Sequence, residues 1–134
     1  MLTDRCNFKL SKLLKEHKFP QRSIEFNSDY YTQNGELIYA VPDTTEKRDL
    51  IFAPYISEVI DRLEIDLGLY LSVFLTTKGY QYRIYDPDNN NYEIMSNLEG
   101  IELSLVAYEL CIEAAINYYY HDDQEERTGI IGIA

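Results

Sequence analysis

The spacing of apolar residues changes once in the second half of this chain, from every second position to a period of about 3.6 residues. Residues 70–95 alternate between apolar and polar side chains around Lys78-Gly79, which is typical of a β-hairpin. Residues 101–120 repeat at helical spacing. A hairpin with one apolar face needs a cover in water, so we expect this helix to lie over the strands. We expect its inner face to consist of Leu103, Ala107, Leu110, Ala114 and Tyr118.

A first helix is predicted over residues 7–17. Asn7 can accept a hydrogen bond from a first-turn amide and so act as the N-cap. Pro20 prevents the helix from continuing, and Lys18 then falls at the left-handed position that usually favours glycine. The apolar stripe of this helix consists of Leu10, Leu13 and Leu14.

Residues 23–41 predict two strands joined by the turn pair Asn34-Gly35, since both of these residues tolerate a positive φ. The alternating apolar positions are Ile24 and Phe26, then Leu37 and Tyr39. After a short apolar run at residues 50–52, a second helix is predicted from Pro54 to Gly68. Its apolar stripe consists of Ile56, Val59, Ile60, Leu63 and Leu67.

These elements predict an α+β fold in which three helices pack mainly on one face of an antiparallel sheet of about five strands. The chain has 134 residues, a length that favours a single domain. We expect that domain to span residues 1–128. Residues 129–134 form an apolar C-terminal tail, which could dock on its own sheet edge, reach a neighbouring chain or stay disordered.

The charge of the chain is unevenly distributed. The net charge is −11, but residues 1–22 hold six basic and two acidic residues. The acidic remainder should repel nucleic acids and anionic lipids, so we expect neither as a direct partner. Two separated cysteines, no export leader and no apolar run of about 18 residues predict a cytoplasmic protein with reduced thiols.

Four segments resemble a family of small uncharacterised proteins from gut Bacteroidales and their phages. Residues 12–19 are similar to that family's opening helix, and residues 51–63 to its aromatic-Ala-Pro segment and second helix. Residues 80–85 resemble its aromatic middle strand, and residues 111–116 its closing helix. The resemblance implies the setting of a phage, a prophage or a mobile element.

The resemblance covers roughly residues 8–120. The chain departs from the family at Lys18 and Cys111, lacks the tryptophan often found in the second helix, and adds the tail at 129–134. Since the family has no assigned activity, the resemblance implies no functional residues.

Asp86, Asp88 and Asn90 are spaced like the first three ligands of a calcium loop. The match ends there, because the loop's sixth position is Asn91 instead of glycine and its twelfth is Asn97 instead of glutamate. We interpret the segment as a hairpin turn.

The sequence contains no catalytic motif, phosphate-binding loop or paired-cysteine metal pattern. His17 and His121 are the only histidines, and a zinc site or a triad could assemble only through space, for example from Cys6 and His17. We therefore predict a protein that is not an enzyme and that holds no cofactor or metal.

The C-terminal part of the chain contains the best candidate interaction surface. Three successive tyrosines on a helix cannot all face one core, and tyrosine is enriched at protein interfaces. Ordinary packing on the sheet is the alternative for the tyrosines of this chain. The candidate residues are Tyr118, Tyr119, Tyr120, Ile130, Ile131 and Ile133.

Together these features predict an accessory protein of a phage or mobile element that binds another protein, with a homodimer as one form. The alternative is an acidic inhibitor that imitates DNA and occupies the cleft of a nucleic-acid-binding host protein. The carboxylates that would imitate phosphates lie on the second and third helices: Glu58, Asp61, Glu64, Asp66, Glu99, Glu102, Glu109 and Glu113.

Overall fold

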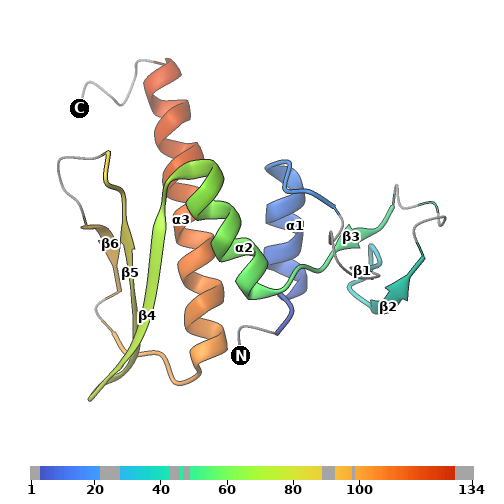
Figure 1. Cartoon of the computed structure of the whole chain (residues 1–134), viewed down its shortest axis with the longest axis horizontal. Helices are drawn as coiled ribbons and strands as arrows, with labels where there is room; N and C mark the ends of the chain where they lie inside the picture. The colour runs from blue at the N-terminus through green and yellow to red at the C-terminus, as the bar shows by residue number, and fades with distance from the viewer. Residues whose placement is uncertain are drawn as a thin grey trace. The chain divides into compact units, whose positions relative to one another are not determined.

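The computed structural model describes residues 4–21, 28–42, 46, 49–88, 93–97 and 99–128. The chain divides into two compact units, Met1–Val59 and Ile60–Ala134. The described residues form three α-helices, one π-helical segment and six strands (Figure 1). The predicted α+β class is therefore confirmed.

The first unit opens with α1 (Phe8–Glu16). The side chain of Asn7 accepts a hydrogen bond from the Leu10 amide at 2.8 Å, so the predicted N-cap is confirmed. Leu10, Ser11 and Leu14 are buried, and the helix lies against β3 (Ile51–Phe52). Lys18 adopts a φ of 67°, the left-handed conformation expected of it.

The strands of the first unit form an antiparallel sheet in the order β2-β1-β3. β1 (Ser28–Tyr31) and β2 (Leu37–Val41) are joined through Asn34 and Gly35, as predicted. The first strand of this hairpin is Ser28–Tyr31, whereas the predicted strand residues Ile24 and Phe26 lie outside the described residues. Tyr30, Val41 and Phe52 form the buried core of the sheet.

An irregularity interrupts the pairing of β1 with β2 between Ser28 and Tyr30. The carboxylate of Asp29 accepts a hydrogen bond from the Ala40 amide at 2.7 Å and forms a 2.9 Å ion pair with Arg5. Ala40 has a φ of 51°, a left-handed conformation that strains a residue with a Cβ. The edge strand β2 is therefore bent by a bulge that buried polar contacts hold in place.

The predicted second helix is present as α2 (Ile56–Arg62), which continues as the π-helical segment η1 (Leu63–Leu67). Gly68 ends it with a φ of 68°, the conformation that glycine adopts at least cost. The buried side chains of α2 and η1 are Ile56, Val59 and Leu63, which belong to the predicted stripe.

The second unit contains a sheet in the order β4-β5-β6, formed by β4 (Tyr70–Thr76), β5 (Gly79–Tyr85) and β6 (Glu93–Ser96). All pairs in it are antiparallel. The long helix α3 (Ser104–Thr128) contacts β4 and β5, so the expected cover of the hairpin is confirmed. Figure 1 shows α3 running beside this sheet.

The structure differs from the predicted single sheet of about five strands, because the described strands form two sheets of three. The pairing of three helices with one face of one sheet is therefore not confirmed. Apolar alternation predicts that a strand exists but not which strand it pairs with. A single domain over 1–128 stays a prediction, and the tail 129–134 lies outside the described residues.

Candidate functional site

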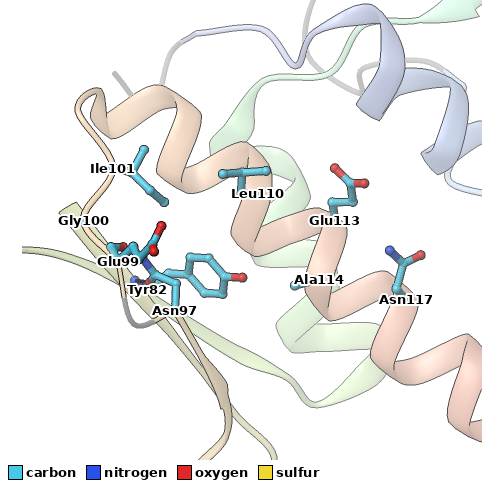
Figure 2. Close-up of a pocket in the computed structure, with 9 residues that line it drawn as sticks. All are labelled: Tyr82, Asn97, Glu99, Gly100, Ile101, Leu110, Glu113, Ala114 and Asn117. Carbon is cyan, nitrogen blue, oxygen red and sulfur yellow. Dashed lines mark hydrogen bonds between the residues drawn. The ribbon is translucent and has the colours of Figure 1, made fainter. Parts of the chain in front are cut away.

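The second unit contains an open cavity of about 360 Å³ between β5, the segment 97–101 and α3 (Figure 2). Figure 2 shows the Tyr82 ring on one side and the side chains of α3 on the other. The lining residues are Tyr82, Asn97, Glu99, Gly100, Ile101, Leu110, Glu113, Ala114 and Asn117.

Backbone contacts hold the segment 97–101 against β5. Tyr80 and Ile101 exchange two backbone hydrogen bonds, of 2.8 and 2.9 Å. The side-chain oxygen of Asn97 accepts from the Tyr82 amide at 2.5 Å, and its side-chain nitrogen donates to the carbonyl of Glu99. Gly100 permits this approach, because a Cβ there would collide with the carbonyl of Lys78. One wall of the cavity is therefore fixed by main-chain geometry.

Burial dominates the electrostatics around the cavity. Burial raises the pKa of Tyr82, and the nearby Cys111 and Glu113 raise it further. Burial raises the pKa of the Cys111 thiol to about 12, so this cysteine stays protonated and is a poor nucleophile. None of the nine lining residues is a histidine, lysine, serine or cysteine.

Exposed apolar side chains at the start of α3 lie at the cavity. Leu103 just before the helix, Val106 and Leu110 are 64%, 37% and 42% exposed. Their spacing of three and four residues places them on one face. Glu102 and Glu109 flank them, and the sequence contains no lysine or arginine between Arg83 and Arg127. This outward stripe (Leu103, Val106 and Leu110) is an apolar patch in a wholly acidic segment.

The predicted inner face of the helix is buried only in part. Ala107 is buried as predicted, and Ala114 and Tyr118 are half-buried. Leu103 and Leu110 are 64% and 42% exposed, although Leu110 also lines the cavity beside β5. The residues that face the core instead include Cys111, Ile112, Ala115 and Ile116, each at most 1% exposed. Apolar residues occupy both sides of this helix, so its sequence alone does not select the buried side.

The three predicted tyrosines do not form one patch. Tyr118 is half-buried and its hydroxyl donates to the Asp86 carboxylate at 3.3 Å. Tyr119 is 37% exposed and contacts the Tyr120 ring edge-on, with centroids 5.2 Å apart. Burial raises the pKa of Tyr120, with smaller effects from Tyr119 and Asp66. Their role in binding stays a prediction, and Ile130, Ile131 and Ile133 lie outside the described residues.

The Asp86 segment forms a turn. The Asp86 carboxylate accepts a hydrogen bond from the Asp88 amide at 3.0 Å, which is the geometry of an Asx turn. Asn90 and Asn91 lie outside the described residues.

The residues considered for a zinc site are not exposed. Cys6 is buried, and His17, at the end of α1, is half-buried. Across the part of the chain that the structure describes, no three His, Cys, Asp or Glu side chains gather in a group that could hold a metal ion.

Sequence reasoning missed the wall formed by Asn97 and Gly100, and it expected Leu103 and Leu110 to be buried, whereas both are exposed. The only available signal for the stripe was the i, i+3, i+7 spacing of Leu103, Val106 and Leu110. That spacing identifies a face but not the direction in which it points.

Comparison of the chain with protein-family models, with curated proteins and with solved structures finds no match. Among the described residues, no helix has the length and apolar character that crossing a bilayer requires.

Proposed function

We propose that this protein is a non-enzymatic accessory protein that acts by binding another protein through the outward stripe of α3. The observation that carries the proposal is the exposure of Leu103, Val106 and Leu110 on one face of a helix. Contiguous exposed apolar side chains with a polar rim mark interaction sites in soluble proteins. The phage or mobile-element setting rests on the resemblance of the sequence alone.

The stripe could anchor a partner protein. Full burial of a leucine or valine side chain contributes roughly 1.5–3 kcal/mol, so covering these three side chains would supply the core of a modest interface. The adjoining cavity of about 360 Å³ could receive one side chain of the partner. The flanking carboxylates of Glu102 and Glu109 would favour a partner with basic residues around its own apolar patch.

The test is affinity capture from a Bacteroidales lysate with three versions of the chain. The wild-type protein should retain a specific protein that the double variant Leu103→Ser/Leu110→Ser loses. Ile65→Ser is the matched control, because Ile65 is a 74% exposed apolar residue on η1 and not on α3. Retention of the same proteins by all three versions would contradict the proposal. Purified partner and chain should then bind directly, with at least a tenfold loss for the double variant.

A cytoplasmic location belongs to the same proposal. Both cysteines are buried thiols outside any disulfide, which suits a reducing compartment but does not require one.

An acidic inhibitor that imitates DNA is the second candidate. It is favoured by exposed carboxylates on the second unit, at Asp61, Glu64, Asp66, Glu99 and Glu102. Its binding to a basic cleft should weaken strongly as salt rises, because the attraction is mainly electrostatic. Binding through the apolar stripe should change far less. A salt series with the captured partner therefore separates the two candidates.

A further inference from the structure

We propose that the outer edge of β4 pairs with the β4 of a second copy of this chain, so that two copies form a continuous six-stranded antiparallel sheet. The inference uses a surface different from the outward stripe and does not depend on the proposed function.

β4 is an edge strand that lacks the usual protection. In the order β4-β5-β6 it has one neighbour among the described strands. Natural edge strands are protected by charged residues, proline, bulges or short length. β4 has seven residues, Tyr70–Thr76, and none is charged or a proline. Its pairing with β5 runs without a shift from Tyr70 to Thr76, so no bulge bends it.

The other long edge of the molecule shows what protection looks like. β2 in the first unit is also an edge strand, and a bulge opposite Asp29 and the left-handed Ala40 distort it. A strand that departs from regular pleating in this way is a poor template for another strand. The regularity of β4 is therefore a property of this strand and not of every edge in the protein.

Hydrogen bonds in the sheet show which backbone groups of β4 face outward. The Tyr80 backbone bonds to Ile101, and the Tyr82 amide donates to Asn97, so both residues direct these groups away from β4. In an antiparallel pair, residues opposite each other direct their backbone groups either both inward or both outward. Tyr80 lies opposite Leu75, and Tyr82 opposite Val73.

The same alternation places the backbone groups of Leu71 on the outer edge with those of Val73 and Leu75. In the described part of the chain no hydrogen bond is made by these three N–H and three C=O groups to another strand or loop. They form a row spaced like the hydrogen-bonding groups of an antiparallel strand.

This row is complementary to itself under a twofold axis through Val73. In that register Val73 faces Val73 of the second copy, and Leu71 faces Leu75. All six outward groups then find partners in each copy, and three apolar side chains from each copy adjoin on one face of the joined sheet. Leu75, which is 68% exposed, would be covered by this pairing. Isologous contacts of this kind close on themselves and stop at a dimer.

Charge also favours a second copy in this register. Lys78 at the tip of the hairpin would lie opposite Gly68 of the other copy, next to the exposed Asp66 of η1. The strand itself brings no charge into the contact, despite the chain's net charge of −11. Lys78 and Asp66, near the two ends of the contact, are therefore of opposite sign.

The first test is the mass in solution, by sedimentation or light scattering over a concentration series. The wild-type chain should reach twice the 15.7 kDa of one copy. Leu75→Lys adds a charge at an exposed edge position, and Val73→Pro removes the central outward N–H without removing a bond to β5. Both variants should remain monomeric to at least tenfold higher concentration. Leu103→Lys, a change at a similarly exposed leucine on α3, should leave the dimer intact.

The second test reads the register and does not need a destabilised variant. Cysteine at Val73 should give a covalent dimer on mild oxidation, because facing Cα atoms in a hydrogen-bonded pair lie about 5.5 Å apart. The single variant Leu75→Cys should not form a covalent dimer, since the two Leu75 positions would lie roughly 14 Å apart. A Leu71→Cys variant mixed with a Leu75→Cys variant should cross-link, because these two positions face each other.

A chain that stays monomeric at all concentrations overturns this inference, as does a dimer that persists in Leu75→Lys and Val73→Pro. Cross-linking through Leu75 alone would also overturn it, and so would capture of another protein's extended segment by this edge in place of self-pairing. The proposed function fails separately, if the outward-stripe variants keep their captured partner.

Discussion

The helices α1 and α3 differ in how far their sequences determine which side is buried. α1 carries its apolar residues on one side, with lysines on the other, and the predicted stripe is the one that is buried, at Leu10 and Leu14. α3 carries apolar residues nearly all round, and the predicted stripe is partly exposed, at Leu103 and Leu110. A one-sided helix has one orientation that hides its apolar surface, whereas an apolar helix has several of similar free energy.

The surplus apolar surface of α3 has a consequence for function. α1 buries its apolar residues within its own unit and exposes lysines, so its surface is what a solvated helix requires. α3 buries one apolar side and still exposes another, which a monomer gains nothing by keeping in water. This difference underlies the proposal that the extra apolar residues of α3 serve contacts beyond this chain.

The difference between the two sides of α3 can be tested by truncating one residue on each side. Ile112 is fully buried, and Ile112→Ala should lower the free energy of unfolding by about 2–5 kcal/mol, since it leaves a cavity. Leu110→Ala on the exposed side should lower it by less than about 1 kcal/mol. Urea unfolding followed by circular dichroism measures both. A larger loss for Leu110→Ala would restore the face predicted from the sequence.

Alkaline pH should reveal the burial of Cys111. Burial raises the pKa of its thiol from an ordinary value near 9 to about 12. Above pH 9 the unfolded chain loses this proton while the folded chain keeps it, so stability falls as pH rises toward 12. The slope approaches about 1.4 kcal/mol per pH unit from this group.

The pH effect is isolated by comparing wild type with Cys111→Ala in urea unfolding between pH 8 and 10.5. The difference in unfolding free energy between the two proteins should shrink with rising pH, because only the wild type carries the titrating thiol. A constant difference would place Cys111 on the exposed side of α3.

The start of α1 depends on one side chain. Asn7→Ala removes the hydrogen bond to the Leu10 amide and should cost about 1 kcal/mol of stability. Asn7→Asp is the control and should retain most of it, because a carboxylate also accepts this bond. Thermal unfolding of the three proteins measures the effect. Equal losses for alanine and aspartate would mean that the cap contributes nothing through its acceptor oxygen.

The end of α1 should respond in the opposite direction. Lys18 holds a φ of 67°, which costs a residue with a Cβ about 1 kcal/mol, so Lys18→Gly should stabilise the protein by about 0.5–1 kcal/mol. The same change at Lys12, an exposed interior position of α1, should destabilise it by a similar amount. If both glycine variants lose stability, the left-handed position contributes no strain.

Local chemistry in the sequence was sufficient to predict the features that depend on neighbouring residues. The N-cap at Asn7, the left-handed Lys18, the turn at Asn34-Gly35 and the helix end at Gly68 each follow from what a few adjacent side chains and φ angles allow. The β4–β5 hairpin followed in the same way, because its two strands are separated by two residues.

Only the tertiary structure decided how these elements combine. The pairing of β1 with β3 across 19 intervening residues could not be predicted from the sequence. Nor could the close approach to β5 that Gly100 permits. Both depend on chain positions that meet only in the fold. The same holds for the side of α3 that is buried: several apolar faces were available, and the fold buries Ile112 and Ile116 while it leaves Leu103 and Leu110 exposed. Short-range geometry is set by covalent neighbours and is therefore written in the sequence, whereas the choice among equivalent surfaces is a packing competition that the assembled chain resolves.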